Sequence, residues 1–165
     1  MSRILFRIDD RLIHGQVVVG WVRYMEATKI IVANDLLAND ETQKMLYKMV
    51  ATNDLGIDVL PVEEAARWAL KRSAAEQNTI FLFENPADIL RFAQLGVPMA
   101  SINIGGMRSS QGKRQIHEAV FVDKKDYQMF HTLKAMGIKI EIRMVPNDPS
   151  QDLMQRISEL IKSWE

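Results

Sequence analysis

The sequence predicts an α/β protein built on an open, mainly parallel, doubly wound sheet. Short runs rich in β-branched residues alternate some six times with longer segments of helical periodicity, which is typical of strand–helix–strand units. The run KIIVA (29–33) is apolar after its first residue, as expected of a strand that is covered on both faces. The segment IKIEIRMV (138–145) instead alternates apolar and charged residues. We therefore place it near a sheet edge, where it could run antiparallel.

The first part of the chain is expected to contain three strand–helix units. RILFRI (3–8) is strand-like, and the following helix (15–26) would bury a face with helical spacing, made of Val18, Trp21, Val22 and Met25. The strand 29–33 precedes a helix over 39–51, for which Asp40 or Asn39 is a suitable N-cap. DVLPV (58–62) and the segment 63–73 form the third unit.

The second part continues the same rhythm. TIFLF (79–83) is followed by a helix over 87–96, where Gly96 occupies the position of a C-terminal glycine. The other predicted strands are ASINIGG (100–106) and EAVFV (118–122), and the other predicted helices are 124–136, ending before Gly137, and 150–164. The last helix is amphipathic, and we assign its apolar face to core packing, with Leu153, Ile157, Leu160 and Ile161.

Length and composition favour one globular domain over residues 1–165. Lys plus Arg and Asp plus Glu each total 21, so no global charge attracts nucleic acid or anionic lipid, and we expect no nucleic-acid partner. The chain has no cysteine, which excludes disulfides, thiol nucleophiles and thiolate metal sites. No signal-peptide pattern and no run of roughly 18 apolar residues is present, so we expect a cytoplasmic protein.

Three loops are candidates for the functional site. Ligands of open parallel sheets bind outside the carboxyl ends of the strands, which selects residues 9–14, AND (33–35) and GGMRSSQGKRQ (105–115). The first and third loops carry basic residues and glycines suited to an anion of phosphate size. The candidate phosphate- or partner-binding residues are Asp9, Gly15, Gln16, Asn34, Asp35, Gly105, Gly106, Arg108, Lys113 and Arg114.

His14 is the candidate nucleophile. It precedes or begins the first helix, where free N–H groups and the helix dipole favour an anion and a neutral imidazole. Arg11 could clamp a phosphoryl group. Asp9 or Asp10 could accept a proton from the other ring nitrogen and orient the imidazole, and Asp10 could alternatively support the loop.

Simpler interpretations remain open from the spacing alone. His14 could be an exposed polar residue, Asp9 and Asp10 could cap the helix, and the glycines of 105–115 could only shape a turn. His117 and His131 fall outside the three loops, so we assign them to the surface and expect no metal site. Phosphate-binding loops of nucleotide enzymes and the hydrolase elbow are absent, so we expect no cofactor. A phosphoryl group on His14 would then have to come from another protein.

Several stretches together resemble the mannose/fructose/sorbose family of enzyme IIB components of the bacterial phosphoenolpyruvate-dependent sugar phosphotransferase system. They are RIDDRLIHGQVVVGW (7–21), KIIVAND (29–35), VEEAA (62–66), NIGGM…GKRQI (103–116) and VDKKD…LK…GIKIEIR.VPNDP (122–149), and they cover essentially the whole chain in order. The motif DDRLIHGQV is highly specific. Phe121 departs from the small polar residue that relatives tend to have there, which leaves partner choice and sugar class open.

The resemblance implies a sheet of about seven strands, mixed at one edge, and a phosphotransferase function. His14 would accept a phosphoryl group from a phosphohistidine of enzyme IIA, through Nδ1, with Arg11 as the phosphoryl ligand. It would pass the group to a sugar entering through the membrane components IIC and IID, which could hold the protein at the inner face of the membrane. A regulatory phosphorelay with the same His14 chemistry, and a small-anion or nucleotide-binding module, are the alternatives.

Overall fold

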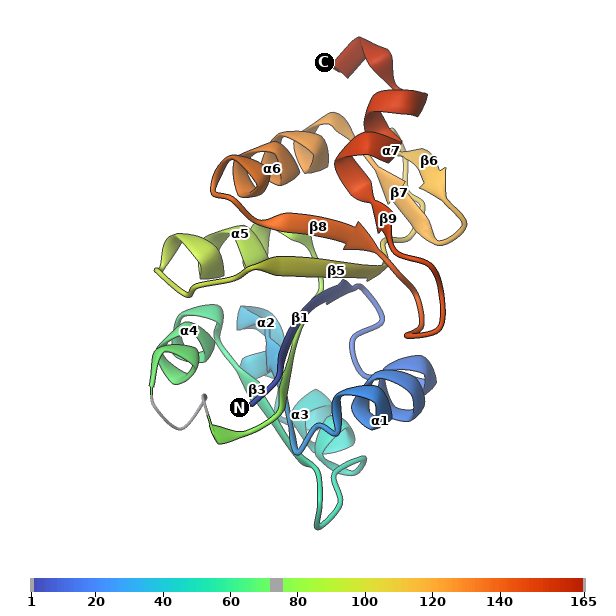
Figure 1. Ribbon diagram of the computed structural model, residues 1–165. Helices are drawn as coiled ribbons and strands as arrows, with labels where there is room; N and C mark the ends of the chain where they lie inside the picture. The colour runs from blue at the N-terminus through green and yellow to red at the C-terminus, as the bar shows by residue number, and fades with distance from the viewer. Residues whose placement is uncertain (1, 72–75, 165) are drawn as a thin grey trace.

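The computed structural model describes residues 2–71 and 76–164. Its main sheet has the strand order β3-β2-β4-β1-β5-β8-β9, and all neighbouring strands are parallel except β8 and β9 (Figure 1). The strands are β1 (Ile4–Asp9), β2 (Lys29–Ala33), β3 (Gly56–Leu60), β4 (Thr79–Phe83), β5 (Ser101–Gly106), β8 (Lys139–Ile142) and β9 (Gln151–Asp152). The predicted mainly parallel α/β sheet, mixed at one edge, is confirmed.

Helices cover both faces of this sheet. One layer contains the π-helical turn η1 (Gln16–Trp21), α1 (Val22–Met25), α2 (Asp35–Ala38) and α3 (Glu41–Lys48). The other contains α4 (Val62–Leu70), α5 (Pro86–Gln94), α6 (Lys124–Ala135) and α7 (Leu153–Leu160), which the short 3₁₀ turn η3 (Lys162–Trp164) follows. Across the described ranges, none of these helices has the length and apolar character needed to cross a membrane.

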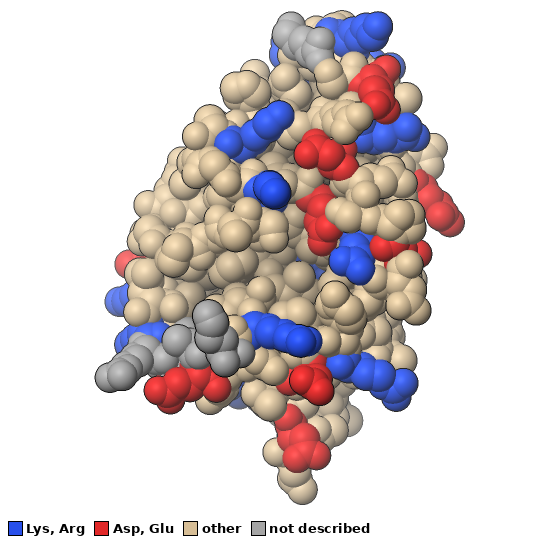
Figure 2. Space-filling view, viewed as in Figure 1, with Lys and Arg blue, Asp and Glu red and all other residues tan. Residues whose placement is uncertain are grey.

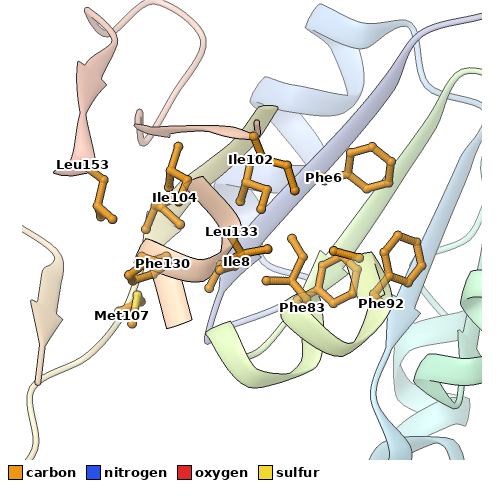
Figure 3. Close-up of a cluster of buried hydrophobic side chains, with 14 of the residues drawn as sticks. Phe6, Ile8, Phe83, Phe92, Ile102, Ile104, Met107, Phe130, Leu133 and Leu153 are labelled. Carbon is orange, nitrogen blue, oxygen red and sulfur yellow. The ribbon is translucent and has the colours of Figure 1, made fainter. Parts of the chain in front are cut away.

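The larger core lies between the sheet and the α4–α7 layer. Figure 3 shows aromatic and aliphatic side chains from β1, β4 and β5 packed against those of α5, α6 and α7. Phe6 and Phe81 stack, and the ring of Phe92 is tilted against both, with ring centroids 5.3–5.7 Å apart. Such aromatic contacts bury large apolar areas and fix the helices on the sheet. β1 and β5 are parallel neighbours in the sheet, so their carboxyl ends lie side by side.

The predicted helix ends agree with the structure at several places. Asp40 caps α3 by accepting a hydrogen bond from Gln43 N at 3.1 Å. Gly96 follows α5 with φ of +97°, a left-handed conformation that favours glycine. The helix predicted over 39–51 corresponds to α3, whereas the short helix α2 before it was not predicted, and α4 ends at Leu70. Residues 72–73 of the helix predicted over 63–73 lie outside the described residues.

The strand within 138–145, β8, lies next to the edge of the sheet as predicted, but it does not run antiparallel to the rest of the sheet. β8 pairs in parallel with β5, and only β9 runs antiparallel to it. The charge alternation arises because Ile140 and Ile142 enter the core while Glu141 is on the opposite face, where it contacts Asn103. β9 takes up Gln151 and Asp152, so α7 begins at Leu153 and not at residue 150. Leu160, expected in the core, is 42% exposed.

A small hairpin separates β5 from α6. Its strands β6 (Arg114–His117) and β7 (Val120–Val122) pair antiparallel in a sheet of their own. The sequence predicted a strand over 118–122 but not its partner, because 114–117 carries charged and polar residues at three of four positions. Phe121 N donates to Met107 O at 2.8 Å and joins the hairpin to the end of β5.

The first helix differs from prediction in its winding. It buries Val17, Trp21 and Met25, whereas Val18 and Val22 are only half-buried. Its first part is π-helical, with Val22 N bonded to Val17 O. Since a π-helix bonds residues five apart and is wider than an α-helix, its buried positions recur every four residues. The α-helical spacing used for the prediction therefore selected Val18 in place of the buried Val17.

Candidate functional site

The site is formed where the loop 10–15 leaves β1. The chain after β1 goes to the η1 layer, whereas the chain after the adjacent β5 goes to the α6 layer. Two neighbouring strands that diverge in this way open a crevice at their carboxyl ends. Leu12 makes the loop turn with φ of +55°, and its side chain is buried against the smaller core. The Leu12 side chain therefore anchors the loop to the core, while Asp10, Arg11 and His14 remain exposed or half-buried.

Asp9 is the centre of the site. Its buried carboxylate accepts hydrogen bonds from Arg11 (N at 3.1 Å, Nε at 3.0 Å and Nη2 at 3.1 Å), from Arg7 Nη2 at 3.1 Å and from His14 Nε2 at 2.8 Å. Burial alone would raise the pKa of the Asp9 carboxyl, but the hydrogen bonds from Arg11 and His14 and the charge of Arg7 outweigh it and hold this pKa below its ordinary value. Asp9 is therefore an anion at neutral pH.

The Asp9 contact determines how the His14 ring is protonated. An ionised carboxylate can only accept hydrogen bonds, so Nε2 carries the proton in the neutral ring and Nδ1 keeps its lone pair. The His14 side chain is 17% exposed. A neutral imidazole with its Nδ1 lone pair available can act as a nucleophile. The structure thus places Asp9, and not Asp10, on the imidazole.

Asp10 binds the neighbouring loop, which follows β5. Its carboxylate accepts from Arg108 N at 2.7 Å and from Arg108 Nε at 2.9 Å. This ion pair joins the loop after β1 to the loop after β5. The expected contact from Asp10 to the imidazole is replaced by that of Asp9, and the contacts of Asp10 match the alternative of loop support.

Several other predicted residues gather around Asp9. Arg11 directs its Nε and Nη2 at Asp9 and donates from Nη2 to Gln16 Oε1 at 3.2 Å, while 40% of its side chain stays exposed. Gly106 lies so close that a Cβ there would be 3.2 Å from Asp9 Oδ1. Gly15 starts the helix, and residues 15–17 precede its first hydrogen bond, from Val18 N to His14 O at 3.1 Å. Their N–H groups are at the positive helix end.

Three of the remaining predicted residues, Asn34, Asp35 and Lys113, have partners of their own. Asn34 caps α2 and donates to Glu84 at 2.7 Å, and Asp35 accepts from Val62 N and from Arg91. Lys113 forms an ion pair with Asp126 at 2.8 Å, and Arg114 is exposed on β6. These contacts tie residues to the scaffold rather than to His14. Of the predicted basic residues, Arg11 and Arg108 therefore pair with the acids at the end of β1 and in the loop after it, and Lys113 does not.

A cavity of about 350 Å³ opens beside the loop. Its lining residues come from the loops after β1 and β5 and from the hairpin: Asp10, Arg11, Gly106, Arg108, Ser109, Ala119 and Phe121. The wider cavity between α6 and α7, of about 620 Å³, contains none of the His14 loop residues and has no role in this chemistry. Phe121, which we expect to differ from the corresponding residue of relatives, therefore lines the cavity beside the His14 loop.

The two other histidines lie elsewhere. His131 is exposed on α6, as predicted. His117 is only half-buried on β6, and its Nδ1 is buried without a hydrogen-bond partner among the described residues. Its assignment to the surface is therefore only partly right, because β6 was not predicted.

Sequence reasoning missed two buried polar residues of the site, Arg7 and Asn103. Arg7 contacts Asp9 and Asn103, and both side chains are almost fully buried. A charged or amide residue inside an apolar strand, as in ILFRI and SINI, is the signal that could have identified them, since such groups are rarely buried without a partner.

Comparisons with known proteins identify the family of this chain. The family described as "PTS system sorbose subfamily IIB component" matches residues 3–163. The mannose-specific EIIAB component of Escherichia coli is 40% identical over 96% of this chain and 49% of its own length, and the fructose-specific EIIB component of Bacillus subtilis is 37% identical over 98% and 99%. The crystal structure of the IIB domain of the sorbose permease from Klebsiella pneumoniae superimposes with a TM-score of 0.89 and 38% identity, covering 96% of this chain and 98% of that one.

Proposed function

This chain belongs to the sorbose subfamily of IIB components of the sugar phosphotransferase system, and from that membership we propose that His14 is the residue that carries the phosphoryl group. As a IIB component it is a phosphotransferase that passes phosphate to sugar. We further propose that residues 1–165 act as one domain. The observation that carries the assignment to His14 is its Nε2 contact with Asp9 at 2.8 Å, which leaves Nδ1 as the nucleophile.

The first step transfers the phosphoryl group from a IIA donor. The Nδ1 lone pair of His14 attacks phosphorus, an N–P bond forms, and the N–P bond of the donor's phosphohistidine breaks with its electron pair returning to the donor ring. Positioning and electrostatics supply most of the catalysis in such a transfer. Arg11 is the candidate phosphoryl ligand, because its half-exposed guanidinium is fixed by Asp9 beside His14.

In the second step a sugar hydroxyl oxygen attacks phosphorus. The N–P bond to His14 breaks, the electron pair returns to Nδ1, and the hydroxyl proton is released to water. Asp9 holds the proton on Nε2 throughout both steps. The sugar would be presented by membrane components IIC and IID, so the protein would work at the inner face of the membrane. Arg108 and the exposed loops after β1 and β5 are the candidate partner-binding residues. The regulatory phosphorelay uses the same chemistry, and no observation on the described residues favours it.

The experiment is a reconstituted phosphorylation. The protein is incubated with enzyme I, the small histidine phosphocarrier, a cognate IIA and labelled phosphoenolpyruvate. We expect acid-labile label on the wild type, none on His14→Ala, and wild-type labelling of the matched control His131→Ala, since His131 is exposed on α6. Label that persists on His14→Ala would exclude His14 as the carrier.

A further inference from the structure

Arg7 is a fully buried cation in the middle of the sheet. Its side chain is 0% exposed, and its guanidinium bridges three structural elements. Nη2 donates to Asp9 Oδ2 at 3.1 Å and to Met144 O at 3.0 Å, and Nη1 donates to Arg143 O at 3.0 Å and to Asn103 Oδ1. One side chain of β1 thus joins the acid of the site to β5 and to the loop after β8.

The surroundings are shaped for this guanidinium. A Cβ at Gly105 would lie 1.8 Å from Nη2 and 2.1 Å from Cζ of Arg7, so only glycine leaves room for the group. The Trp21 ring covers it from the η1 side, with Cζ 5.2 Å from the ring centroid. Trp21 Nε1 also donates to Met144 O at 2.9 Å, the carbonyl that Arg7 binds. The helix that follows His14 is therefore packed on the same group.

Stability alone does not account for a cation in this position. Burial lowers the pKa of Arg7 to about 10, against the raising effect of Asp9, so the group is still charged at neutral pH and is held at a cost. Apolar residues of similar volume often replace buried ion pairs without loss of stability. Among the described residues, Arg7 Nε also has no hydrogen-bond partner. Unlike an apolar side chain, the guanidinium donates hydrogen bonds to Asp9 and to the backbone carbonyl groups of residues 143 and 144, and so holds them in place.

We propose that Arg7 is a positioning residue for phosphoryl transfer: by holding Asp9 Oδ2 in place, it keeps Nε2 of His14 protonated and Nδ1 free to react. The proposal rests on the function proposed for His14. Asp9 Oδ2 receives both Arg7 Nη2 and His14 Nε2. Without Arg7 the carboxylate can rotate toward Arg11, and the His14 ring then samples the tautomer that carries its proton on Nδ1 and cannot attack phosphorus.

The test compares Arg7→Met, which fills a similar volume without charge, with Arg7→Lys. Lysine keeps the charge but not the planar set of N–H donors of a guanidinium. Arg67→Met is the matched control, because Arg67 is exposed on α4. Three quantities are measured on each protein: folded stability in urea, the ¹⁵N shifts of the His14 ring, which report the tautomer, and the rate of labelling by phosphorylated IIA.

We expect Arg7→Met to transfer roughly 10–100-fold more slowly, the range for removing a residue that orients a ligating histidine, with Nδ1–H tautomer newly populated. Arg7→Lys should be intermediate and Arg67→Met unchanged. A slower transfer without a tautomer change, a wild-type rate in folded Arg7→Met, or unfolding of both Arg7 variants would each overturn the positioning role. A wild type that takes no label would instead refute the function proposed for His14.

Discussion

Asp9 and Asp10 are adjacent in the sequence but have different partners. Both follow the last apolar residue of β1, so their spacing alone did not distinguish which one meets the imidazole. The structure separates them with an irregularity: Ile8 pairs with Ile104, but Asp9 pairs with Gly106, and Gly105 is the extra residue. An extra residue in one strand re-aims the side chains beside it. Such an extra residue leaves no periodic pattern in a single sequence from which it could be predicted.

Asp9→Asn should weaken the fold and change its response to acid. The variant leaves the buried Arg7 without its anion, and removing one partner of a buried pair costs about 3–5 kcal/mol. Because the pKa of Asp9 is lowered in the folded protein, its contribution is complete above the ordinary carboxyl pKa near ~4 and is lost as the pH falls through the lowered value. Urea unfolding at a series of pH values from neutral to strongly acidic measures both effects.

The control for this experiment is Asp54→Asn, since Asp54 is exposed in the turn before β3. The wild type and the control should both lose stability in acid, whereas Asp9→Asn should start lower and lose less over the same pH range. If the free energy of unfolding of Asp9→Asn and of the wild type changed with pH in parallel, the assigned electrostatic role of Asp9 would be contradicted.

At the level of elements, the π-helical turn η1 determines how the His14 loop is attached to the sheet. Its wider winding brings Val17 and Trp21 to one side, and the Trp21 ring contacts both Arg7 and Arg143. The sequence QVVVGW contains apolar residues at four of its six positions, so both helical windings can bury an apolar face there. Packing of Trp21 over two guanidinium groups, a tertiary effect, distinguishes them in the structure.

Trp21→Phe should destabilise the protein by about 2 kcal/mol, because it removes the hydrogen bond to Met144 O and leaves a small cavity over Arg7. Urea unfolding followed by circular dichroism measures this loss. The matched control is Trp164→Phe, since Trp164 is half-buried in η3 against Tyr127 and should cost less than half as much. An equal loss for both variants would show that Trp21 contributes only its apolar surface.

For the whole molecule, the sequence predicted the parts of the fold that carry periodicity. The apolar runs of β1, β2 and β4 and the amphipathic helices place the parallel core and the carboxyl edge on which His14 lies. It did not predict β9 or β6, because two-residue and polar strands have no hydrophobic pattern. The buried network of Arg7 and Asn103 was missed because most partners of these two residues are remote in the sequence.

Charge is balanced over the chain, so any attraction to a partner must be local. Lys and Arg total 21, as do Asp and Glu, and Figure 2 shows the two signs interspersed over the viewed face rather than gathered into one field. At the His14 edge, most cations are already paired with Asp9, Asp10 or Asp126. Arg108 is the most exposed of these, with 72% of its side chain accessible. It is therefore the cation best placed to act during encounter.

Arg108→Ala should slow association with IIA and leave the transfer step unchanged. Rim charges act mainly on the association rate and its salt dependence, and salt screens exposed charges over about 10 Å at 0.1 M. With limiting IIA at low salt, we expect labelling several-fold slower than wild type and a weaker decline with added salt. With saturating IIA the rates should agree, and stability should change by less than about 1 kcal/mol, since the Arg108 side chain of this pair is largely exposed.

Arg11→Ala provides the contrast, because Arg11 lies beside His14 and not at the rim. It should lower the rate at saturating IIA, where association no longer limits labelling, and keep the salt dependence of the wild type. Arg67→Ala, far from this edge on α4, should change neither quantity. If Arg108→Ala lowered the saturated rate and kept the wild-type salt dependence, Arg108 would belong with Arg11 among the groups that bind the phosphoryl group during transfer.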